Sequence, residues 1–497
     1  MNETNIPELR AASSGANATR ARLPSRVHFV GAGGAGLSGA ALLLLERGHQ
    51  LSGHDRAVSG FVDALRARGM PVAVGQSDAR LLGHDVQLVV RSAAIGLDDP
   101  QVAEALRRGL PVLKYAELLG LLGPERRTLA VAGTHGKTTS SWLVFHALRG
   151  IAHAAGADAP GALVGGSCRV IGSNAVPGGA RGWFACEACE YDRSFLQLAP
   201  EGAIVTNVEA DHLDYYGSLA AIEEAFARFV DRVHPEGLLV VGREVPARVE
   251  HAARCAVWRL GRELHVDLLG ESQGRFRFRL RGPGWATPPV ALAIPGAFNV
   301  DNAALALALA VGLAGRTSGL SPAECADGAA RGVQRYVGAA RRFEPWGTFG
   351  GIELVHDYAH HPTEVRVTLE AARRAFAGKP LHVLFQPHQH SRTARFLDEF
   401  VDALRGADRV LVADVYGARQ HIDREAAGAP ELVARLRRAG LDALEAGSPS
   451  AAVKLLAAGL PSPCAALILG AGDIDLAHDE LIEAVALRGS AARLARA

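Results

Sequence analysis

Short segments rich in β-branched residues alternate with segments of helical period along most of this 497-residue chain, from Arg26 onward. Such alternation is typical of parallel sheets whose strands are joined by crossover helices. The length exceeds what one hydrophobic core usually holds, so we expect three domains. The predicted fold class is α/β, with a Rossmann-like N-terminal domain, a P-loop ATPase-like central domain and a Rossmann-like C-terminal domain. The predicted bounds are 1–25 for a disordered leader, then 26–123, 124–338 and 339–497.

The expected elements follow from the same periodicity. The first domain has expected strands at Val27–Gly31, Leu51–Gly53, Val86–Val90 and Val112–Leu113 and a helix at Gly36–Arg47. The second has strands at Thr128–Ala132, Trp183–Cys186 and Ala203–Thr206, a helix after Gly136, a β-rich insertion between Leu264 and Ile294, and a helix at Asn299–Leu313. The third has strands at Ile352–Val355, Leu381–Phe385, Val410–Ala413 and Ala466–Leu469, and helices at Thr363–Phe376 and Thr393–Arg405.

Composition argues against several classes of protein. The formal net charge of +1 provides no basic field for nucleic acid. The longest aliphatic run, Ala40–Leu45, is far shorter than the roughly 20 residues that span a bilayer. Residues 1–25 lack the apolar core of a signal peptide. We therefore expect a cytoplasmic protein, a monomer or weak homodimer, that binds small molecules and neither nucleic acid nor membrane.

A glycine-rich segment, Gly133-Thr134-His135-Gly136-Lys137-Thr138-Thr139, lies between an expected strand and an expected helix. Backbone amides at such a helix start can hold phosphates, with the lysine at the β/γ-phosphates and the hydroxyl on Mg²⁺. The loop is two residues shorter than the usual pattern. However, lysine is rare here, since only four of the 53 lysines and arginines are lysines: Lys114, Lys137, Lys379 and Lys454. We therefore predict an ATP site at Lys137 and Thr138.

A second glycine loop, Gly31-Ala32-Gly33-Gly34-Ala35-Gly36, follows the first strand, and Asp55 comes about 20 residues later. This spacing is typical of a dinucleotide-binding loop, although such glycines also serve helix–sheet packing. A hydride-transferring enzyme is the alternative, but it would not need the loop at Lys137. Two loops indicate two phosphorylated ligands.

Acidic residues and an imidazole follow two neighbouring strands beside the second loop: Glu187, Glu190, Asp192, Asp211, His212 and Asp214. Oxygen and nitrogen donors at adjacent strand ends are suited to Mg²⁺ bound to ATP. Cys186 and Cys189 form a Cys-x-x-Cys pair, but no second ligand pair accompanies them, so small residues at a strand end are the preferred interpretation over metal or redox work.

Five histidines follow two strands of the third domain: His356, His360, His361, His388 and His390. Because the carboxyl ends of parallel strands share one edge of a sheet, we expect a binding site at this edge.

Five segments together resemble the Mur ligase family: His28–Gly36, Gly133–Thr139, Asn207–His212, Asp357–Glu364 and Phe385–Arg392. The resemblance runs from about Val27 to Asp473. It implies an ATP- and Mg²⁺-dependent ligase of peptidoglycan precursor synthesis. Such an enzyme forms an amide bond between the carboxylate of UDP-N-acetylmuramate and L-alanine through an acyl phosphate, and releases ADP and phosphate.

The resemblance also implies roles for individual residues. The catalytic residues would be Lys137, Glu187, His212, Arg342 and His360, and the metal ligands Thr138, Glu187 and His212. ATP would contact the Gly133–Thr139 loop, Asn299, Asn302, Arg342 and Asp357. The UDP-sugar would contact Gly31, Gly33, Gly34, Gly36 and Asp55, and the amino acid His360, His388 and Arg392.

This chain departs from the family at several positions. Cys189 stands where Asp is usual, Gln389 where Arg is, His390 where Tyr is, and Phe298 where His is. A usual Gly-His is Gly75-Gln76, and a usual Glu is Gln420. The alternatives are a murein peptide ligase that attaches a preformed peptide, a later-acting Mur ligase, or a catalytically weak UDP-sugar-binding regulator. Several later-acting relatives need a carbamylated lysine in the central domain, which this chain lacks between Lys137 and Lys379.

Overall fold

The computed structural model describes residues 23–122, 127–417 and 428–494. Most of the predicted leader, the predicted boundary at Gly123 and the departure at Gln420 lie outside these residues. The chain divides into two compact units. The first holds residues up to Ser167, Ile171–Leu264 and Leu305–Gly332, and the second holds Cys168–Val170, His265–Ala304 and the chain from Val333 onward. The domain bounds given above remain predictions.

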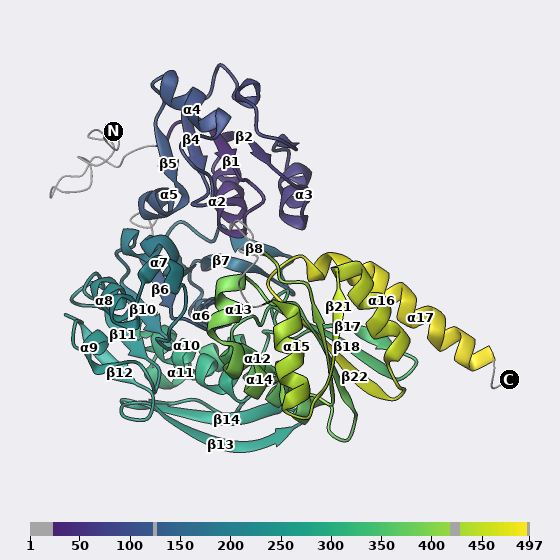
Figure 1. Ribbon diagram of the computed structural model, residues 1–497. Helices are drawn as coiled ribbons and strands as arrows, with labels where there is room; N and C mark the ends of the chain where they lie inside the picture. The colour runs from purple at the N-terminus through teal and green to yellow at the C-terminus, as the bar shows by residue number, and fades with distance from the viewer. Residues whose placement is uncertain (1–22, 123–126, 418–427, 495–497) are drawn as a thin grey trace. The chain divides into compact units, whose positions relative to one another are not determined.

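The first sheet has five parallel strands in the order β3-β2-β1-β4-β5. Figure 1 shows β1 between β2 and β4, as in one half of a Rossmann fold. Helix α2 begins where β1 ends and is buried along Leu37–Leu44, which explains its almost uniformly apolar sequence. The elements are β1 (Arg26–Val30), α2 (Ala35–Glu46), β2 (Gln50–Asp55), α3 (Gly60–Ala67), β3 (Val72–Val74), η1 (Ala79–Leu81), β4 (Leu88–Arg91), α4 (Pro100–Arg107), β5 (Val112–Lys114) and α5 (Tyr115–Leu122).

The second sheet has seven strands in the order β12-β11-β10-β6-β9-β7-β8, also in the first unit. Its central strand β6 pairs in parallel with β10 and β9, so the segments after these three strands meet at one edge. The elements are β6 (Arg127–Ala132), α6 (Lys137–Ala155), β7 (Gly161–Cys168), β8 (Ser173–Val176), β9 (Trp183–Glu187), η2 (Tyr191–Gln197), β10 (Gly202–Val205), α7 (Leu213–Tyr216), α8 (Leu219–Val230), β11 (Leu238–Val241), α9 (Ala247–Glu250), β12 (Ala256–Arg259), α10 (Phe298–Ala314), η3 (Gly315–Thr317) and α11 (Pro322–Val333).

The expected β-rich insertion is an antiparallel sheet of the second unit, in which β14 pairs with β13, β15 and β16. Its inward side chains alternate along β14, where Phe276, Phe278 and Leu280 are buried between exposed arginines. This alternation is what a sheet with one solvated face requires. The strands are β13 (His265–Ser272), β14 (Arg275–Gly282), β15 (Trp285–Ala286) and β16 (Val290–Ala291).

The last sheet has six strands in the order β17-β18-β22-β19-β20-β21, and only β17 is antiparallel. The elements are β17 (Glu344–Phe349), β18 (Ile352–Asp357), α12 (Pro362–Ala375), β19 (Leu381–Phe385), α13 (His390–Arg395), α14 (Leu397–Leu404), β20 (Arg409–Ala413), α15 (Ala429–Arg438), β21 (Asp442–Gly447), α16 (Pro449–Gly459), β22 (Cys464–Leu469), η4 (Ile474–Ala477) and α17 (His478–Leu494). Three sheets with crossover helices confirm the predicted α/β fold class.

One predicted helix is wrong. The segment predicted as a helix at Thr393–Arg405 is two helices, α13 and α14, which meet at Phe396. Phe396 has φ −107° and ψ 28°, outside the helical region, and its ring packs against His361 with centroids 5.0 Å apart. A tertiary contact of this kind leaves no periodic signal in the sequence.

One helix among the described residues is long and apolar enough to cross a membrane by length and composition, at Phe298–Thr317. Its 18-residue apolar window is 83% buried inside the protein. That burial is typical of a core helix, and the helix matches the expected one at Asn299–Leu313.

Candidate functional site: two glycine loops and a histidine edge

The first glycine loop turns sharply between β1 and α2. Gly31 has φ +84°, and its amide and that of Ala32 donate to the carbonyl of His54. The amide of Gly33 donates to Asp55 Oδ2 at 2.7 Å. A Cβ at Gly33 would lie 2.9 Å from that oxygen, which explains the glycine. The predicted residues Gly31, Gly33 and Asp55 are therefore brought together, and here the Asp55 carboxylate holds the loop.

The first turn of α2 has no side-chain cap. Gly34 is the N-cap residue, with no side-chain cap and no acidic residue in the first turn of the helix. A helix start of this kind presents amide groups and positive dipole to an anion. Gly36 packs against Tyr115, whose ring would lie 2.6 Å from a Cβ at that position.

The second glycine loop connects β6 to α6 and also requires its glycines. Gly133 has φ +141°, and a Cβ there would lie 1.8 Å from Thr206 Oγ1. Gly136 is left-handed, with φ +80°, and is the N-cap residue of α6. Asn207 binds the loop twice, accepting from the amide of Thr134 through its carbonyl and from the amide of His135 through Oδ1. The Asn207 segment therefore shapes the loop.

The ammonium of Lys137 is folded back onto this loop. Its Nζ donates to the carbonyls of Gly133 at 2.7 Å and Thr134 at 2.9 Å, and lies 2.9 Å from Glu190 Oε2. Burial is the largest single influence on the pKa of Lys137 and lowers it, but the charges of Glu190 and Glu187 and the hydrogen bond to Glu190 are among the effects that together raise the pKa. Lys137 is therefore a charged group at the mouth of the loop.

Thr138 and Glu187 form the oxygen pair expected of a metal site. Thr138 Oγ1 donates to Glu187 Oε2 at 2.9 Å, and the amide of Gly165 donates to the same oxygen at 2.8 Å. A hydroxyl and a carboxylate are oxygen donors of the kind that Mg²⁺ prefers. The residues present therefore fit the ion.

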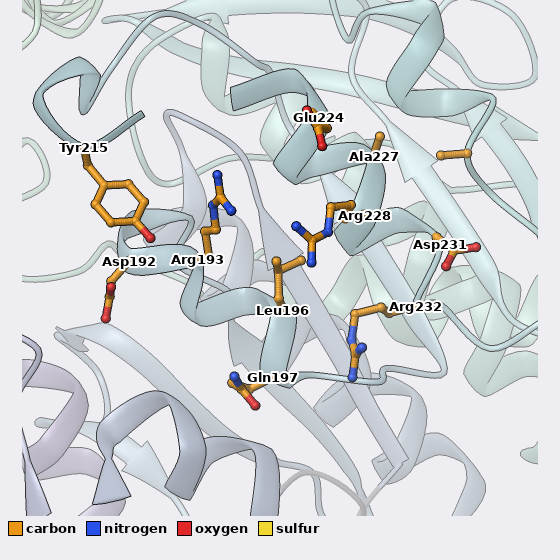
Figure 2. A pocket seen from close by; sticks show the side chains of 11 residues that line it. Asp192, Arg193, Leu196, Gln197, Tyr215, Glu224, Ala227, Arg228, Asp231 and Arg232 are labelled. Atoms are coloured by element: carbon orange, nitrogen blue, oxygen red, sulfur yellow. The ribbon is translucent and has the colours of Figure 1, made fainter. Parts of the chain in front are cut away.

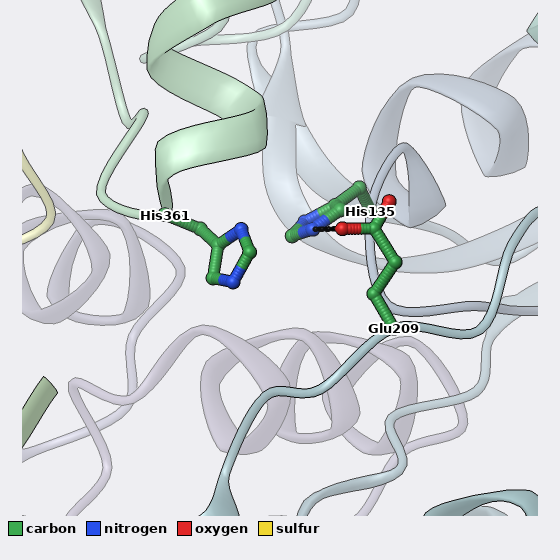
Figure 3. A group of neighbouring side chains, drawn as sticks. All are labelled: His135, Glu209 and His361. Carbon is green, nitrogen blue, oxygen red and sulfur yellow. Dashed lines mark ion pairs between the residues drawn. The ribbon is translucent and has the colours of Figure 1, made fainter. Parts of the chain in front are cut away.

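The segment after β10 contributes Glu209, Asp211 and His212. Figure 3 shows Glu209 beside His135 of the glycine loop, with His135 Nε2 and Glu209 Oε2 3.6 Å apart. The third predicted metal ligand, His212, contacts Tyr191 with ring centroids 5.0 Å apart and lies 3.8 Å from Asp211. Among the described residues no hydrogen bond joins His212 to Thr138 or Glu187, so its ligand role stays a prediction.

Glu190 belongs to the acids expected near Mg²⁺, and in the structure it pairs with Lys137, a contact that the sequence did not predict. Asp192, from the same group, pairs with Lys114 Nζ at 3.1 Å. The scarcity of lysine was the one available signal, because each of so few lysines needs a counter-charge.

Cys186 is buried in β9, and burial, followed by the charge of Glu187, raises the pKa of its thiol to about 12.

In the second unit, Glu364 links two predicted residues. Its Oε1 lies 3.8 Å from Arg342 Nη1, and its Oε2 lies 3.2 Å from His360 Nδ1. The guanidinium of Arg342 also lies over the ring of Tyr358 at 5.1 Å. Arg342 and His360 are thus held by one carboxylate, which sequence reasoning did not single out.

Asp357 is buried and holds the backbone around it. It accepts from the amides of Phe343 at 2.7 Å and Ala359 at 2.8 Å. Burial raises its pKa from 3.8 to about 6, against the opposing effect of Arg342. This carboxylate therefore changes charge close to neutral pH.

The predicted amino-acid residues also come together. The rings of His360 and His388 have centroids 5.4 Å apart, and Arg392 Nη1 lies 3.1 Å from His388 Nδ1. A guanidinium only donates, so His388 Nδ1 must accept and carry no proton. Tyr416 stacks on His388 with centroids 5.6 Å apart.

The other predicted histidines of this edge are placed differently. His356 is fully buried against Trp346, and burial, with Arg341, lowers its pKa to about 3. His361 is the N-cap residue of α12 and accepts from the amide of Thr363. His356 and His361 thus have structural contacts of their own, and a site shared by the five histidines stays a prediction.

Asn299 and Asn302 are buried at the start of α10. Asn302 Nδ2 donates to Asn299 Oδ1 at 3.1 Å, and Asn299 Nδ2 donates to the carbonyl of Pro295. The neighbouring departure, Phe298, packs over Gly296, whose φ is +102°. The ring of Phe298 would lie 2.5 Å from a Cβ there.

A cavity of about 900 Å³ is lined mainly by residues of η2 and α8. Figure 2 shows Arg193 and Arg228 among its lining side chains, with Leu196 between them. Asp192, one of the acids expected near Mg²⁺, lines this cavity, whereas the predicted metal ligands Thr138, Glu187 and His212 do not.

A parallel sheet with a glycine loop that ends in Lys-Thr at a helix start defines a phosphate-loop, nucleotide-binding α/β protein. Three family profiles match along the chain: "Mur ligase family, catalytic domain" at residues 26–127, "Mur ligase middle domain" at 131–310 and "Mur ligase, glutamate ligase domain" at 341–472. The chain therefore belongs to the Mur ligase family, which confirms the resemblance seen in its motifs.

Curated relatives narrow the likeness within the family. The chain is 45% identical to UDP-N-acetylmuramate–L-alanine ligase of Acidothermus cellulolyticus over 79% of this chain and 80% of the relative. It is 42% identical to the ligase of that name from Kineococcus radiotolerans, over 93% and 97%. The crystal structure of UDP-N-acetylmuramate-alanine ligase from Thermotoga maritima is similar with a TM-score of 0.75 and 25% identity, over 92% of this chain and 98% of that one.

Proposed function

We propose that this chain is an ATP-dependent ligase that joins L-alanine to the carboxylate of UDP-N-acetylmuramate, a step of peptidoglycan precursor synthesis that takes place in the cytoplasm. The observation that carries the proposal is the cluster at the start of α6. There, a charged lysine whose side chain is 14% exposed and a Thr–Glu oxygen pair converge beside a phosphate-type loop. Relatives that carry this name at 42–45% identity support the choice of substrates.

The reaction needs activation because a carboxylate has no leaving group that an amine can displace at neutral pH. Transfer of the γ-phosphoryl group of ATP to the carboxylate gives an acyl phosphate, whose leaving group is phosphate. Lys137 supplies a fixed positive charge where the transferred group gains negative charge. Thr138 and Glu187 would hold Mg²⁺, which supplies further charge neutralisation on the phosphates. Arg342, Asp357, Asn299 and Asn302 remain our predicted further contacts of ATP.

The amine must lose a proton before it attacks the acyl carbon. His360 is our candidate base, since Nδ1 faces Glu364 and the carbonyl of Tyr358 at 2.9 Å. An Nδ1–H that donates to these acceptors puts the basic lone pair of the neutral ring on Nε2. Arg392, held by His388, is our candidate for the α-carboxylate of the amino acid.

The test is ADP release on mixing the protein with ATP, Mg²⁺, UDP-N-acetylmuramate and an amino acid. We expect ADP only when all components are present, and the highest kcat/KM with L-alanine. Glycine lacks one methyl, which is worth about 1–3 kcal/mol, so we expect it to be a poorer substrate by roughly 10- to 200-fold. L-Serine and L-alanyl-γ-D-glutamyl-meso-diaminopimelate are the comparison substrates. A higher kcat/KM for the tripeptide would replace this proposal with the murein peptide ligase.

A further inference from the structure

The three hydrogens of the Lys137 ammonium are all used. Two go to the carbonyls of Gly133 and Thr134, and the third to Glu190, whose Oε1 is 3.0 Å away. The side chains are 14% exposed for Lys137 and 4% for Glu190. An ammonium this little exposed is strongly destabilised when the carboxylate bonded to it is removed, so this pair fixes where Nζ can lie.

Glu190 is itself held by its main chain. Its carbonyl accepts from the hydroxyl of Tyr216 at 2.5 Å and from the amide of Arg193 at 2.9 Å. Tyr216 is buried in the core of the unit. The residue thus has a fixed backbone and a side chain that reaches the loop.

A phosphate oxygen can contact Lys137 only by taking the place of one of these three acceptors. The two carbonyls belong to the loop, whose conformation is fixed by Gly133 and by Asn207. The Glu190 carboxylate is the one acceptor on a side chain that can rotate away. The exchange therefore involves Glu190.

We propose that Glu190 is a positioning residue, which holds the ammonium of Lys137 at the mouth of the glycine loop and gives it up to the transferring phosphate. This inference rests on the proposed function. Glu190 acts through Lys137 and touches no substrate atom. It aligns the charge before the reaction, and its own negative charge opposes tight binding of ATP in the ground state.

The chain offers a built-in rescue position. Cys189 precedes Glu190, at a position where the family usually has Asp. An aspartate at 189 would add a carboxylate next to Glu190 in the chain, as a substitute counter-charge. If Glu190 acts as the counter-charge of Lys137, Cys189→Asp should compensate for Glu190→Gln.

The test measures kcat and KM for ATP by ADP release in four full-length variants: Glu190→Gln, Glu190→Asp, Cys189→Asp with Glu190→Gln, and Glu201→Gln. For Glu190→Gln we expect kcat to fall about 10- to 100-fold with a KM for ATP that is unchanged or lower. Glu190→Asp and the double variant should recover at least about a third of the wild-type kcat. Glu201→Gln is the matched control, because it breaks the Arg127–Glu201 ion pair of the same unit, and it should leave both constants unchanged.

Thermal unfolding and ATP calorimetry separate this role from a structural one. A Glu190→Gln protein with an unchanged kcat overturns the inference. So does one whose KM for ATP rises while the melting temperature falls, with no recovery in the double variant. Wild-type protein that forms no ADP overturns the proposed function instead. Calorimetry of ATP binding to the wild type and to Glu190→Gln then still decides the inference. ATP binding by the variant that is as tight as or tighter than that of the wild type supports it, and weaker binding overturns it.

Discussion

The glycine loop at Gly31–Gly36 and the loop at Gly133–Lys137 both connect a buried parallel strand to a helix of the first unit. They differ in the charge that lies inside the turn. In the first loop an acid, Asp55, accepts from the amide of Gly33. In the second a cation, Lys137, donates to the loop carbonyls.

This difference indicates different tasks. A loop that has no cation, and whose acid accepts from one of its own amides, can use its helix start to bind a phosphate group that does not change during the reaction. A loop with a buried ammonium can also stabilise charge that develops in a transition state. We therefore propose that the first loop binds the UDP-sugar and that the second takes part in phosphoryl transfer.

Removal of Lys137 should have the largest effect and should separate the two loops. We expect Lys137→Ala to lower kcat for ADP formation by at least about 10²-fold, because the fixed charge at the transferred group is lost. Affinity for UDP-N-acetylmuramate, measured by calorimetry, should stay within about twofold. Lys454→Ala, at an exposed lysine, is the control. A parallel collapse of UDP-sugar affinity would contradict the division of tasks.

Alanine in place of one glycine from each loop compares their steric limits. Gly133→Ala should lower the free energy of unfolding by about 1–3 kcal/mol, because φ is +141° and the new Cβ would meet Thr206. Gly34→Ala should be nearly neutral, since Gly34 has φ −68° and ψ 137° and its Cβ would lie 3.4 Å from Gly31 O. Urea unfolding of both variants measures the difference. Equal losses would show that the two turns are equally constrained.

Asp55→Ala should affect only the first loop. It leaves the amide of Gly33 without its acceptor, a loss of about 1–3 kcal/mol. We expect KM for UDP-N-acetylmuramate to rise about tenfold, with KM for ATP unchanged. The contrary result, a rise in KM for ATP alone, would reverse the assignment of the loops.

The smallest expected effect is on pH dependence. The pKa of Lys137 is raised, so its charge is constant from pH 5 to 8, whereas Asp357 titrates with a pKa of about 6. If Asp357 accepts from the ribose of ATP, KM for ATP should fall a few-fold between pH 5 and 7, and KM for the UDP-sugar should not. Asp357→Asn should remove this dependence. A slope that persists in Asp357→Asn would assign the titration to another group.

The same carboxylate carries a stability signature of opposite sign. The folded protein holds a proton on Asp357 between the ordinary pKa of 3.8 and the folded value of about 6, where the unfolded chain does not. The contribution of this group to stability is therefore fully present below about pH 4 and is lost as pH rises through about 6.

The periodic parts of the fold could be predicted from the sequence. Strands such as β1 and β19 were expected almost to the residue, because buried parallel strands are continuous apolar runs. Strands β3 and β8 were missed because Val72–Val74 and Ser173–Val176 are too short to show a period. Among the residues that the structure describes, seven strands escaped prediction: β3, β7, β8, β11, β12, β17 and β21.

The site was predicted where a motif is local and missed where a partner is distant. The loop Gly133–Thr139 could be read directly, since strand, glycines and lysine are contiguous. The counter-charge of Lys137 could not, because Glu190 is 53 residues away and is one of several equivalent acids. The break at Phe396 escaped for the same reason, since its ring contacts His361 from another element.

Because the chain has only four lysines, each can be followed separately after chemical labelling. All four lysines are ion-paired: Lys114 with Asp192, Lys137 with Glu190, Lys379 with Glu353 and Lys454 with Glu480. Reductive methylation with ¹³C-formaldehyde would give four side-chain signals in a carbon–proton spectrum. The Lys454 side chain, 66% exposed, should react first, and that of Lys137, 14% exposed, last. The late signal would then move on addition of ATP, while the Lys454 signal would stay in place as an internal reference.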